Sequence, residues 1–269
     1  MSTSTTTSVL AGLEFTRAGA PDGFPVLLHH GLAGSAYVDP DAAEVAAGHG
    51  LDVISVARPG YGRSEPVVME SISQWHTLVE PLLDALGVDR YAVWGISAGA
   101  PYSYSLAAAH PQRVAAVAIT SGLGHIADPR VVEMYDDQSR QAFAYFRDSD
   151  PDAVREYWQQ SMSTSLAAQE PGSKWHDLLV SSLAHECAGP GREAVLQQRP
   201  WGFTFTDIVA PVRLWHSRED PMVPFATAEA IRDALPGAEL RIQQSPEHLV
   251  SEQSTAEAMD FLKAVSKIV

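Results

Sequence analysis

One segment of ten residues constrains the fold of this chain more than any other. An apolar, strand-like run from Tyr91 to Trp94 leads into Gly95-Ile96-Ser97-Ala98-Gly99, and a helix-like run from Tyr102 to His110 follows at once. In this context G-x-S-x-G indicates a serine on a sharp turn between a strand and a helix, with its hydroxyl held out at the end of a parallel sheet. The glycines on either side of Ser97 allow the strand and the helix to approach closely. The segment therefore predicts an α/β protein with Ser97 at a functional position.

Strand-like and helix-like segments alternate over the first 120 residues. Three of the strand-like segments are almost continuous apolar runs, which is typical of strands buried on both faces. Such alternation predicts a mostly parallel sheet that is flanked by helices on both sides. The expected strands are 12–17, 25–30, 51–57, 91–96 and 114–120, and the expected helices are 35–48, 71–86 and 98–110.

The alternation stops between residues 123 and 204, where no strand-like run occurs. Four helix-like stretches (129–147, 152–162, 175–186 and 192–199) fill this region. The breakers between them are Asp150-Pro151, Glu170-Pro171-Gly172 and Gly189-Pro190-Gly191. Alternation resumes with a strand at 212–217, a helix at 225–235, a strand at 239–244 and a helix at 252–268. The pattern predicts a helical insertion within one α/β domain.

Four further motifs follow strand-like runs. They are His30-Gly31, the R-P-G-x-G-x-S run from Arg58 to Ser64, the loop from Ser217 to Pro224, and Ser245-Pro246-Glu247-His248. Together with the serine turn, these motifs resemble those of an α/β-hydrolase. The resemblance implies an α/β-hydrolase fold with a helical cap inserted after the sixth core strand. The core is then expected at 1–122 and 205–269, and the cap at 123–204.

The same resemblance implies a Ser–Asp–His triad of Ser97, Asp220 and His248. His248 takes the serine proton and returns it to the leaving group, and Asp220 orients the imidazole. Two other carboxylates, Glu219 and Asp128, remain open as the acid.

The backbone N–H groups of Leu32 and Ala98 are expected to form the oxyanion hole. They correspond to the residue after His30-Gly31 and the residue after the nucleophile.

The cap region is rich in aromatic residues. His125, Phe146 and Trp158 are candidates for lining a substrate pocket beneath the cap. The alternative, which the sequence leaves open, is that the cap aromatics form the core of the cap itself.

The composition limits the partners of the protein. Its 269 residues include 18 Lys and Arg against 33 Asp and Glu, a formal net charge of −15, which argues against binding nucleic acid or anionic membranes. No segment approaches 18 consecutive apolar residues, and the first eight residues lack the features of a signal peptide. We expect a cytoplasmic monomer or homodimer that contacts no membrane and whose first few residues are disordered.

The histidines and the cysteine do not indicate a metal site. Cys187 is the single cysteine, so the chain has no intramolecular disulfide. His185-Glu186-Cys187 is too compressed for a zinc site and is read as part of a helix. We expect catalysis without a metal or a cofactor.

These features predict a serine hydrolase that cleaves a small-molecule ester or lactone through an acyl-enzyme on Ser97. A serine in place of an aspartate argues against the haloalkane dehalogenase and epoxide hydrolase branches of the family. Carbon–carbon bond hydrolysis, aminopeptidase activity and perhydrolysis remain open on the same triad. A ligand receptor of the same fold that retains the triad is the alternative outside enzymes.

Overall fold

A computed structural model of the chain describes residues 6–266, which contain a single eight-stranded sheet. The strand order is β1-β2-β4-β3-β5-β6-β7-β8, in which β4, β3 and β5 to β8 are parallel and β1 and β2 are antiparallel to their neighbours. The strands are β1 (Thr6–Leu10), β2 (Leu13–Gly19), β3 (Phe24–His29), β4 (Leu51–Val56), β5 (Tyr91–Ile96), β6 (Val114–Thr120), β7 (Val212–Ser217) and β8 (Glu239–Gln243). The predicted mostly parallel sheet is confirmed.

The N-terminal edge of the sheet differs from the prediction. Residues 6–10 form β1, which pairs with β2 across a short turn at Ala11 and Gly12. The sequence predicts no strand before residue 12, so β1 is an addition to the predicted sheet. The first few residues, expected to be disordered, fall on 1–5, which lie outside the described part of the chain.

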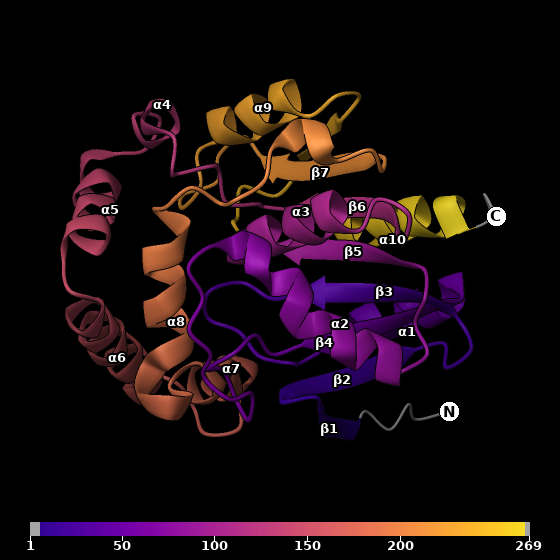
Figure 1. The fold of residues 1–269 in the computed structure, drawn as a ribbon, viewed down its shortest axis with the longest axis horizontal. Coiled ribbons are helices and arrows are strands. Elements are labelled where there is room, and N and C mark those ends of the chain that lie inside the picture. Colours follow the sequence, from indigo (N-terminus) through magenta and orange to yellow (C-terminus); the bar gives the residue numbers. More distant parts are fainter. Residues whose placement is uncertain (1–5, 267–269) are drawn as a thin grey trace.

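Helices cover both faces of the sheet (Figure 1). Residues of α2, α3 and α9 share one apolar core with one face, and residues of α1 and α10 share a second core with the other. Neighbouring residues of β5 show the alternation, since Val93 packs into the first core and Trp94 into the second. These helices are α1 (Pro40–His49), α2 (Trp75–Ala85), α3 (Ala100–Ala109), α9 (Phe225–Ala234) and α10 (Glu252–Ser266), with short 3-10 turns η1 (Ile72–Gln74), η2 (Ser97–Gly99) and η3 (Phe205–Asp207).

Between β6 and β7 the chain forms the predicted helical cap, which lies beyond the carboxyl ends of the parallel strands (Figure 1). Its helices are α4 (Pro129–Val132), α5 (Asp137–Asp148), α6 (Pro151–Ala167), α7 (Lys174–Ser182) and α8 (Ala184–Gln197). The longest of them, α6, packs along α8, which lies between α6 and the sheet in Figure 1. The cap therefore covers the end of the sheet at which the serine turn lies.

Two helices of the cap differ from the prediction. The single helix expected at 129–147 is two helices, because Asp136 caps α5 by accepting a hydrogen bond from the Ser139 N–H at 2.7 Å. Gly189-Pro190-Gly191, read as a breaker, lies inside α8. The interruption is instead at 185–187, which were expected to be helical and have left-handed backbone angles, with φ of 50°, 56° and 64°. The helix starts again after Cys187, so Pro190 lies in a first turn, where proline is tolerated.

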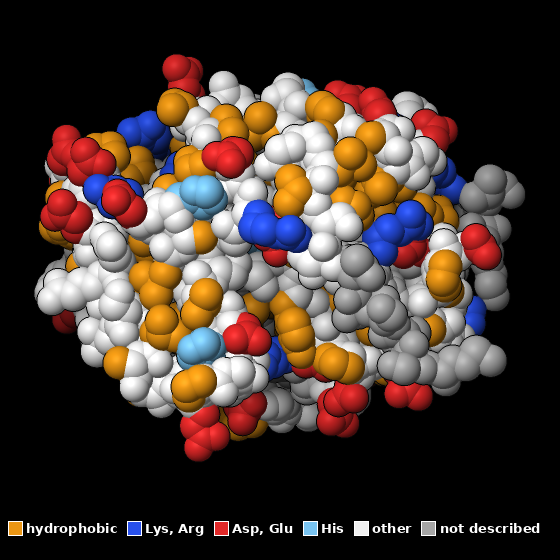
Figure 2. Space-filling model, turned by 90° about the horizontal axis from the view of Figure 1, so that it is seen from below, with side chains coloured by type: hydrophobic (Ala, Val, Ile, Leu, Met, Phe, Trp, Pro, Cys, Tyr) orange, Lys and Arg blue, Asp and Glu red, His pale blue; other side chains and the backbone are white. Residues whose placement is uncertain are grey.

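Charged groups are distributed over the surface of the molecule. Figure 2 shows acidic side chains spread around the rim of one face, with hydrophobic side chains between them. None of the helices in residues 6–266 has the length and apolar character needed to span a bilayer.

Candidate active site

Ser97 lies at the turn between β5 and α3, with its backbone in the left-handed region at φ 50°. This sharp turn requires glycine on both sides. A Cβ on Gly95 would lie 2.6 Å from the Ser103 Oγ, and one on Gly99 would lie 2.7 Å from the carbonyl oxygen of His30. The G-x-S-x-G sequence is thus explained by the close packing of α3 against β5 and the end of β3.

The structure brings Ser97, His248 and Asp220 into one hydrogen-bonded chain. The Ser97 Oγ lies 2.9 Å from the His248 Nε2, and the His248 Nδ1 lies 2.8 Å from the Asp220 Oδ2 and 3.0 Å from its Oδ1. Because Nδ1 faces a carboxylate, it carries the proton, and Nε2 is free to accept the proton of the serine hydroxyl. The three residues come from the ends of β5, β7 and β8, which meet at one edge of the sheet.

The Asp220 carboxylate is fully buried and is held by the loop that follows β7. Its Oδ1 accepts hydrogen bonds from the N–H groups of Met222 at 2.8 Å and Val223 at 2.9 Å. Burial alone would raise the pKa of Asp220, but the hydrogen bonds from His248, Val223 and Met222 outweigh it and hold that pKa below its ordinary value. Asp220 is therefore an ionised partner for the imidazole near neutral pH.

The two other candidate acids lie elsewhere. Glu219 is exposed, and its backbone N–H donates to the Ser217 Oγ. Asp128 caps α4 and pairs with Arg130. Of the three carboxylates considered from the sequence, Asp220 is the one in contact with His248.

The loop that carries His248 is held by Gln243, which the sequence reading missed. The buried Gln243 side chain donates from its Nε2 to the carbonyl oxygens of Glu247, at 3.1 Å, and Leu249, at 2.9 Å. These carbonyls belong to the residues on either side of His248. Gln243 is the last residue of β8, and a polar residue at the end of a strand, five positions before His248, was the signal that the sequence offered.

The loop after β3 passes directly beside the serine. The position of a Cβ on Gly31 would lie 3.6 Å from the Ser97 Cβ. The next residue, Leu32, has an N–H with no hydrogen-bond partner in residues 6–266. Ala98 is buried in the first turn after the nucleophile.

Comparison with known sequences decides the family. The sequence pattern described as alpha/beta hydrolase fold matches residues 25–254, which is most of the chain. The chain belongs to the α/β-hydrolase fold family.

Individual proteins resemble the chain over shorter stretches or at low identity. The uncharacterized hydrolase YcgS of Bacillus subtilis (strain 168) is 30% identical over 111 residues, which are 41% of this chain and 38% of the relative. The proline iminopeptidase of Neisseria gonorrhoeae is 29% identical over 105 residues, 38% of this chain and 34% of the relative. The chain thus spans little more than a third of the length of these relatives.

A solved structure of the same fold is the haloalkane dehalogenase DbeA from Bradyrhizobium elkani USDA94, with a TM-score of 0.76 at 15% identity. The structural match covers 99% of this chain and 99% of the dehalogenase chain. At this identity the likeness concerns the fold alone.

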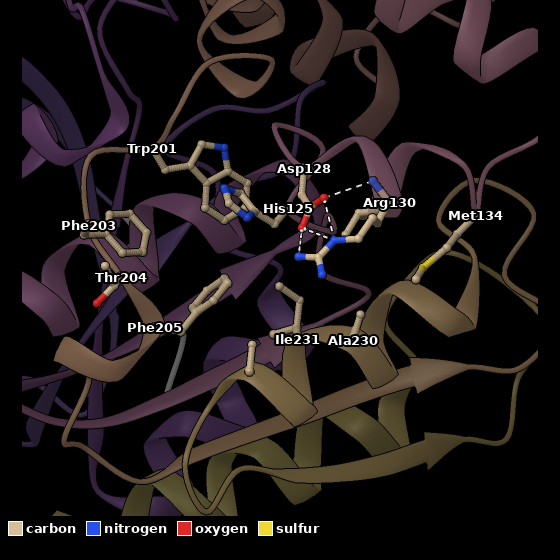
Figure 3. Close-up of a pocket in the computed structure, with 12 residues that line it drawn as sticks. His125, Asp128, Arg130, Met134, Trp201, Phe203, Thr204, Phe205, Ala230 and Ile231 are labelled. Carbon is tan, nitrogen blue, oxygen red and sulfur yellow. Dashed lines mark hydrogen bonds and ion pairs between the residues drawn. The ribbon is translucent and has the colours of Figure 1, made fainter.

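This α/β-hydrolase also has a cavity of about 560 Å³ at the base of the cap (Figure 3). His125 lies in its wall, with its ring 4.5 Å from that of Trp201 in an edge-on arrangement. Helix α9 supplies Ala230 and Ile231 from the opposite side. The remaining wall residues are Asp128, Arg130, Val131, Met134, Phe203, Thr204, Phe205 and Ala234. The wall does not include Ser97, Asp220, His248, Leu32 or Ala98.

The other two pocket candidates lie inside the cap. Phe146 is 5% exposed and packs in a core formed by α5, α6 and α8. Trp158 packs against that core and also against a second cluster that Leu32 contacts. Its buried Nε1–H has no hydrogen-bond partner within residues 6–266. Neither Phe146 nor Trp158 lines the cavity.

Side chains suited to a metal do not gather in the described structure. No group of three or more His, Cys, Asp or Glu side chains in residues 6–266 is arranged to hold an ion.

Proposed function

We propose that this protein is a serine hydrolase that cleaves a carboxylic ester or lactone through an acyl-enzyme on Ser97. The observation that carries the proposal is the contact of 2.9 Å between the Ser97 Oγ and the His248 Nε2, continued to the buried Asp220 carboxylate. A serine hydroxyl is a weak nucleophile, and this arrangement supplies the base that it needs.

The reaction follows from the positions of these groups. The Ser97 Oγ attacks the carbonyl carbon while His248 takes the hydroxyl proton, and the N–H groups of Leu32 and Ala98 receive the negative charge on the carbonyl oxygen. Collapse of this intermediate breaks the bond to the alcohol oxygen, which accepts the proton from His248. Water then attacks the acyl-enzyme and gives its proton to His248, which returns it to Ser97 as the acid is released.

The nucleophile distinguishes this proposal from the chemistry of some structural neighbours. A serine forms an acyl-enzyme, whereas the sequence carries no aspartate at position 97 for displacing a halide. The largely apolar and aromatic wall of the cavity favours a substrate with an apolar portion.

A fluorophosphonate probe followed by a panel of nitrophenyl esters of increasing acyl length tests the proposal. We expect labelling of Ser97 and turnover of at least the short esters. Labelling without turnover of any ester would contradict the proposal and favour the receptor alternative.

The likeness to a proline iminopeptidase supports a second candidate, removal of an N-terminal residue from a peptide. Proline nitroanilide belongs in the same panel for this reason. A kcat/KM higher on this amide than on every ester would favour the aminopeptidase, because anilides are intrinsically less reactive than nitrophenyl esters.

A further inference from the structure

A buried ion pair joins the core of the protein to the cap. Arg58, from the loop after β4, and Glu193, on cap helix α8, are both completely buried. The Arg58 Nε lies 2.5 Å from the Glu193 Oε1, and its Nη2 lies 2.9 Å from the Oε2. The Tyr61 hydroxyl also donates to the Oε2, at 3.1 Å. This two-point geometry fixes the plane of the guanidinium.

The same guanidinium also binds the loop that passes beside Ser97. Its Nη1 donates to the carbonyl oxygen of His30 at 2.6 Å, and its Nη2 donates to the carbonyl oxygen of Gly31 at 3.2 Å. The Gly31 oxygen has a second donor, the His30 Nδ1 at 2.7 Å.

The tautomer of His30 is fixed by Arg58 as well. The backbone N–H of Arg58 lies 3.2 Å from the His30 Nε2, so this nitrogen accepts and the proton is on Nδ1. Burial and the charge of Arg58 hold the pKa of His30 well below its ordinary value, which keeps the ring neutral.

The carbonyl of Gly31 and the N–H of Leu32 belong to one peptide group. That group is planar and trans, so its N–H points away from its C=O. Two donors on the oxygen therefore fix the direction of the N–H on the opposite side of the peptide group. The residue that precedes this N–H, Gly31, lies beside Ser97. Donors to the oxygen also polarise the peptide group, which makes its N–H a stronger donor.

We propose that Arg58, held in place by Glu193 of the cap, is a positioning residue that orients the Leu32 N–H toward the oxyanion. This inference rests on the proposed function. It gives α8 a part in the chemical step, because the cap supplies the carboxylate that fixes the guanidinium.

The test uses variants that keep the shape of the pair. Arg58→Lys keeps the charge but cannot bind the carboxylate at two points and both carbonyls at once. Glu193→Gln keeps the size of the side chain and one acceptor oxygen. Truncating either partner would leave a buried charge unpaired and endanger folding, so alanine variants are avoided. Arg155→Lys is the matched control, since Arg155 pairs with the exposed Glu186 on the outside of the cap.

The measurement is the rate at which a small fluorophosphonate labels Ser97, together with kcat and KM on a nitrophenyl ester. When Ser97 attacks the probe, negative charge develops on the phosphoryl oxygen, which takes the place of the substrate oxyanion. The labelling rate therefore reports how well the N–H donors are aligned with that oxygen. Removal of an oxyanion donor costs about 10²–10³-fold in kcat, and a misaimed donor should cost less. We expect both variants to lower the labelling rate and kcat by about 10- to 100-fold with KM within about threefold. The control should stay near the wild type.

Different outcomes separate this inference from the proposed function. Rates of labelling and kcat that stay at the wild-type value in both folded variants, with only a lower melting temperature or a higher KM, would show that the pair merely anchors the cap. If only one variant folds, it decides the question alone. If neither folds, Tyr61→Phe, which removes one donor to Glu193, replaces them, and an unchanged labelling rate in that variant overturns the inference. A wild-type protein that is not labelled at all would contradict the proposed function itself.

Discussion

The Ser97 hydroxyl contacts His248 because the Ser97 backbone lies in the left-handed region, which few residues other than glycine adopt. Alanine tolerates the same angles about as well as serine does, so the turn should survive removal of the hydroxyl. We expect Ser97→Ala to keep the fold and to lower kcat on a nitrophenyl ester by about 10⁴-fold or more. Circular dichroism checks the fold, and a variant that retained a tenth of the activity would remove Ser97 from the mechanism.

The choice between neighbouring acids is tested by two substitutions. Asp220→Asn should lower kcat by roughly 10⁴-fold, because an amide does not hold His248 in the required tautomer. Glu219→Gln should leave kcat near the wild-type value, since that side chain is exposed. Steady-state kinetics of both variants on one ester measures kcat. A large loss in Glu219→Gln with little loss in Asp220→Asn would assign the role of the acid to Glu219 instead.

The sequence predicts which three residues the structure joins by hydrogen bonds, but not the groups that hold them. Ser97, Asp220 and His248 each lie in a recognisable position after a strand. By contrast, Arg58 and Glu193 are 135 residues apart, and no local pattern links them. Phe146 illustrates the same limit, because an aromatic residue on a cap helix can face either a cavity or the cap core, and only tertiary packing decides.

At the scale of elements, the turn from β5 to α3 tolerates no added atom at Gly99. A Cβ there would lie 2.7 Å from the backbone oxygen of His30 and closer still to that of His29, far closer than van der Waals contact. These oxygens cannot move without disturbing the loop after β3. We expect Gly99→Ala to lower the free energy of unfolding by about 1–3 kcal/mol and to lower kcat. Gly48→Ala is the control, because Gly48 lies in helix α1 with open space around it. This substitution should raise the free energy of unfolding by about 0.5–1 kcal/mol. Urea denaturation measures both, and equal effects would contradict the steric argument.

The cap shows why element boundaries were harder to predict than element types. Five helices occur where helices were expected, but α8 runs through Gly189-Pro190-Gly191. A proline signals a break only when the helix has already begun, and here the left-handed turn at 185–187 places the beginning just before it. No residue in His185-Glu186-Cys187 is a glycine, so the sequence carried little signal for that turn.

The core of the cap offers a stability prediction. Phe146 packs with Val154 and Ala194 in the interior formed by α5, α6 and α8. Phe146→Ala should lower the free energy of unfolding of the cap by about 3–5 kcal/mol. Trp175→Ala, at a side chain that is 40% exposed, should have a smaller effect. Thermal melts compare the two. An unchanged melting temperature for Phe146→Ala, with an altered preference for acyl length, would instead assign Phe146 to the substrate pocket.

For the whole molecule, buried histidines make stability depend on pH. Burial, and to a smaller degree the charge of Arg58, hold the pKa values of His29 and His30 well below 6.5. Below pH 6.5 the unfolded chain binds protons that the folded protein does not, so the stabilisation present above that pH is lost as the pH falls. We expect the urea midpoint to decrease from pH 7 to pH 5.

Substitution of one buried histidine isolates this effect. His29→Gln should reduce the change in midpoint between pH 7 and pH 5, whatever its effect on the midpoint itself. His185→Gln, at an exposed position, should leave that change as it is in the wild type. A pH dependence that is identical in all three proteins would assign the acid sensitivity to other groups.

The ion pair between Arg58 and Glu193 bears on how the cap can diverge or be exchanged. A cap transplanted from a relative that has no carboxylate at the position of Glu193 would leave the buried, charged Arg58 without its partner. Chimeras would have to carry a carboxylate at that point of α8, or replace the arginine at the same time. In this protein a substitution at Arg58 in the core therefore requires a matching substitution at Glu193 in the cap, and the cap cannot be exchanged independently of the core.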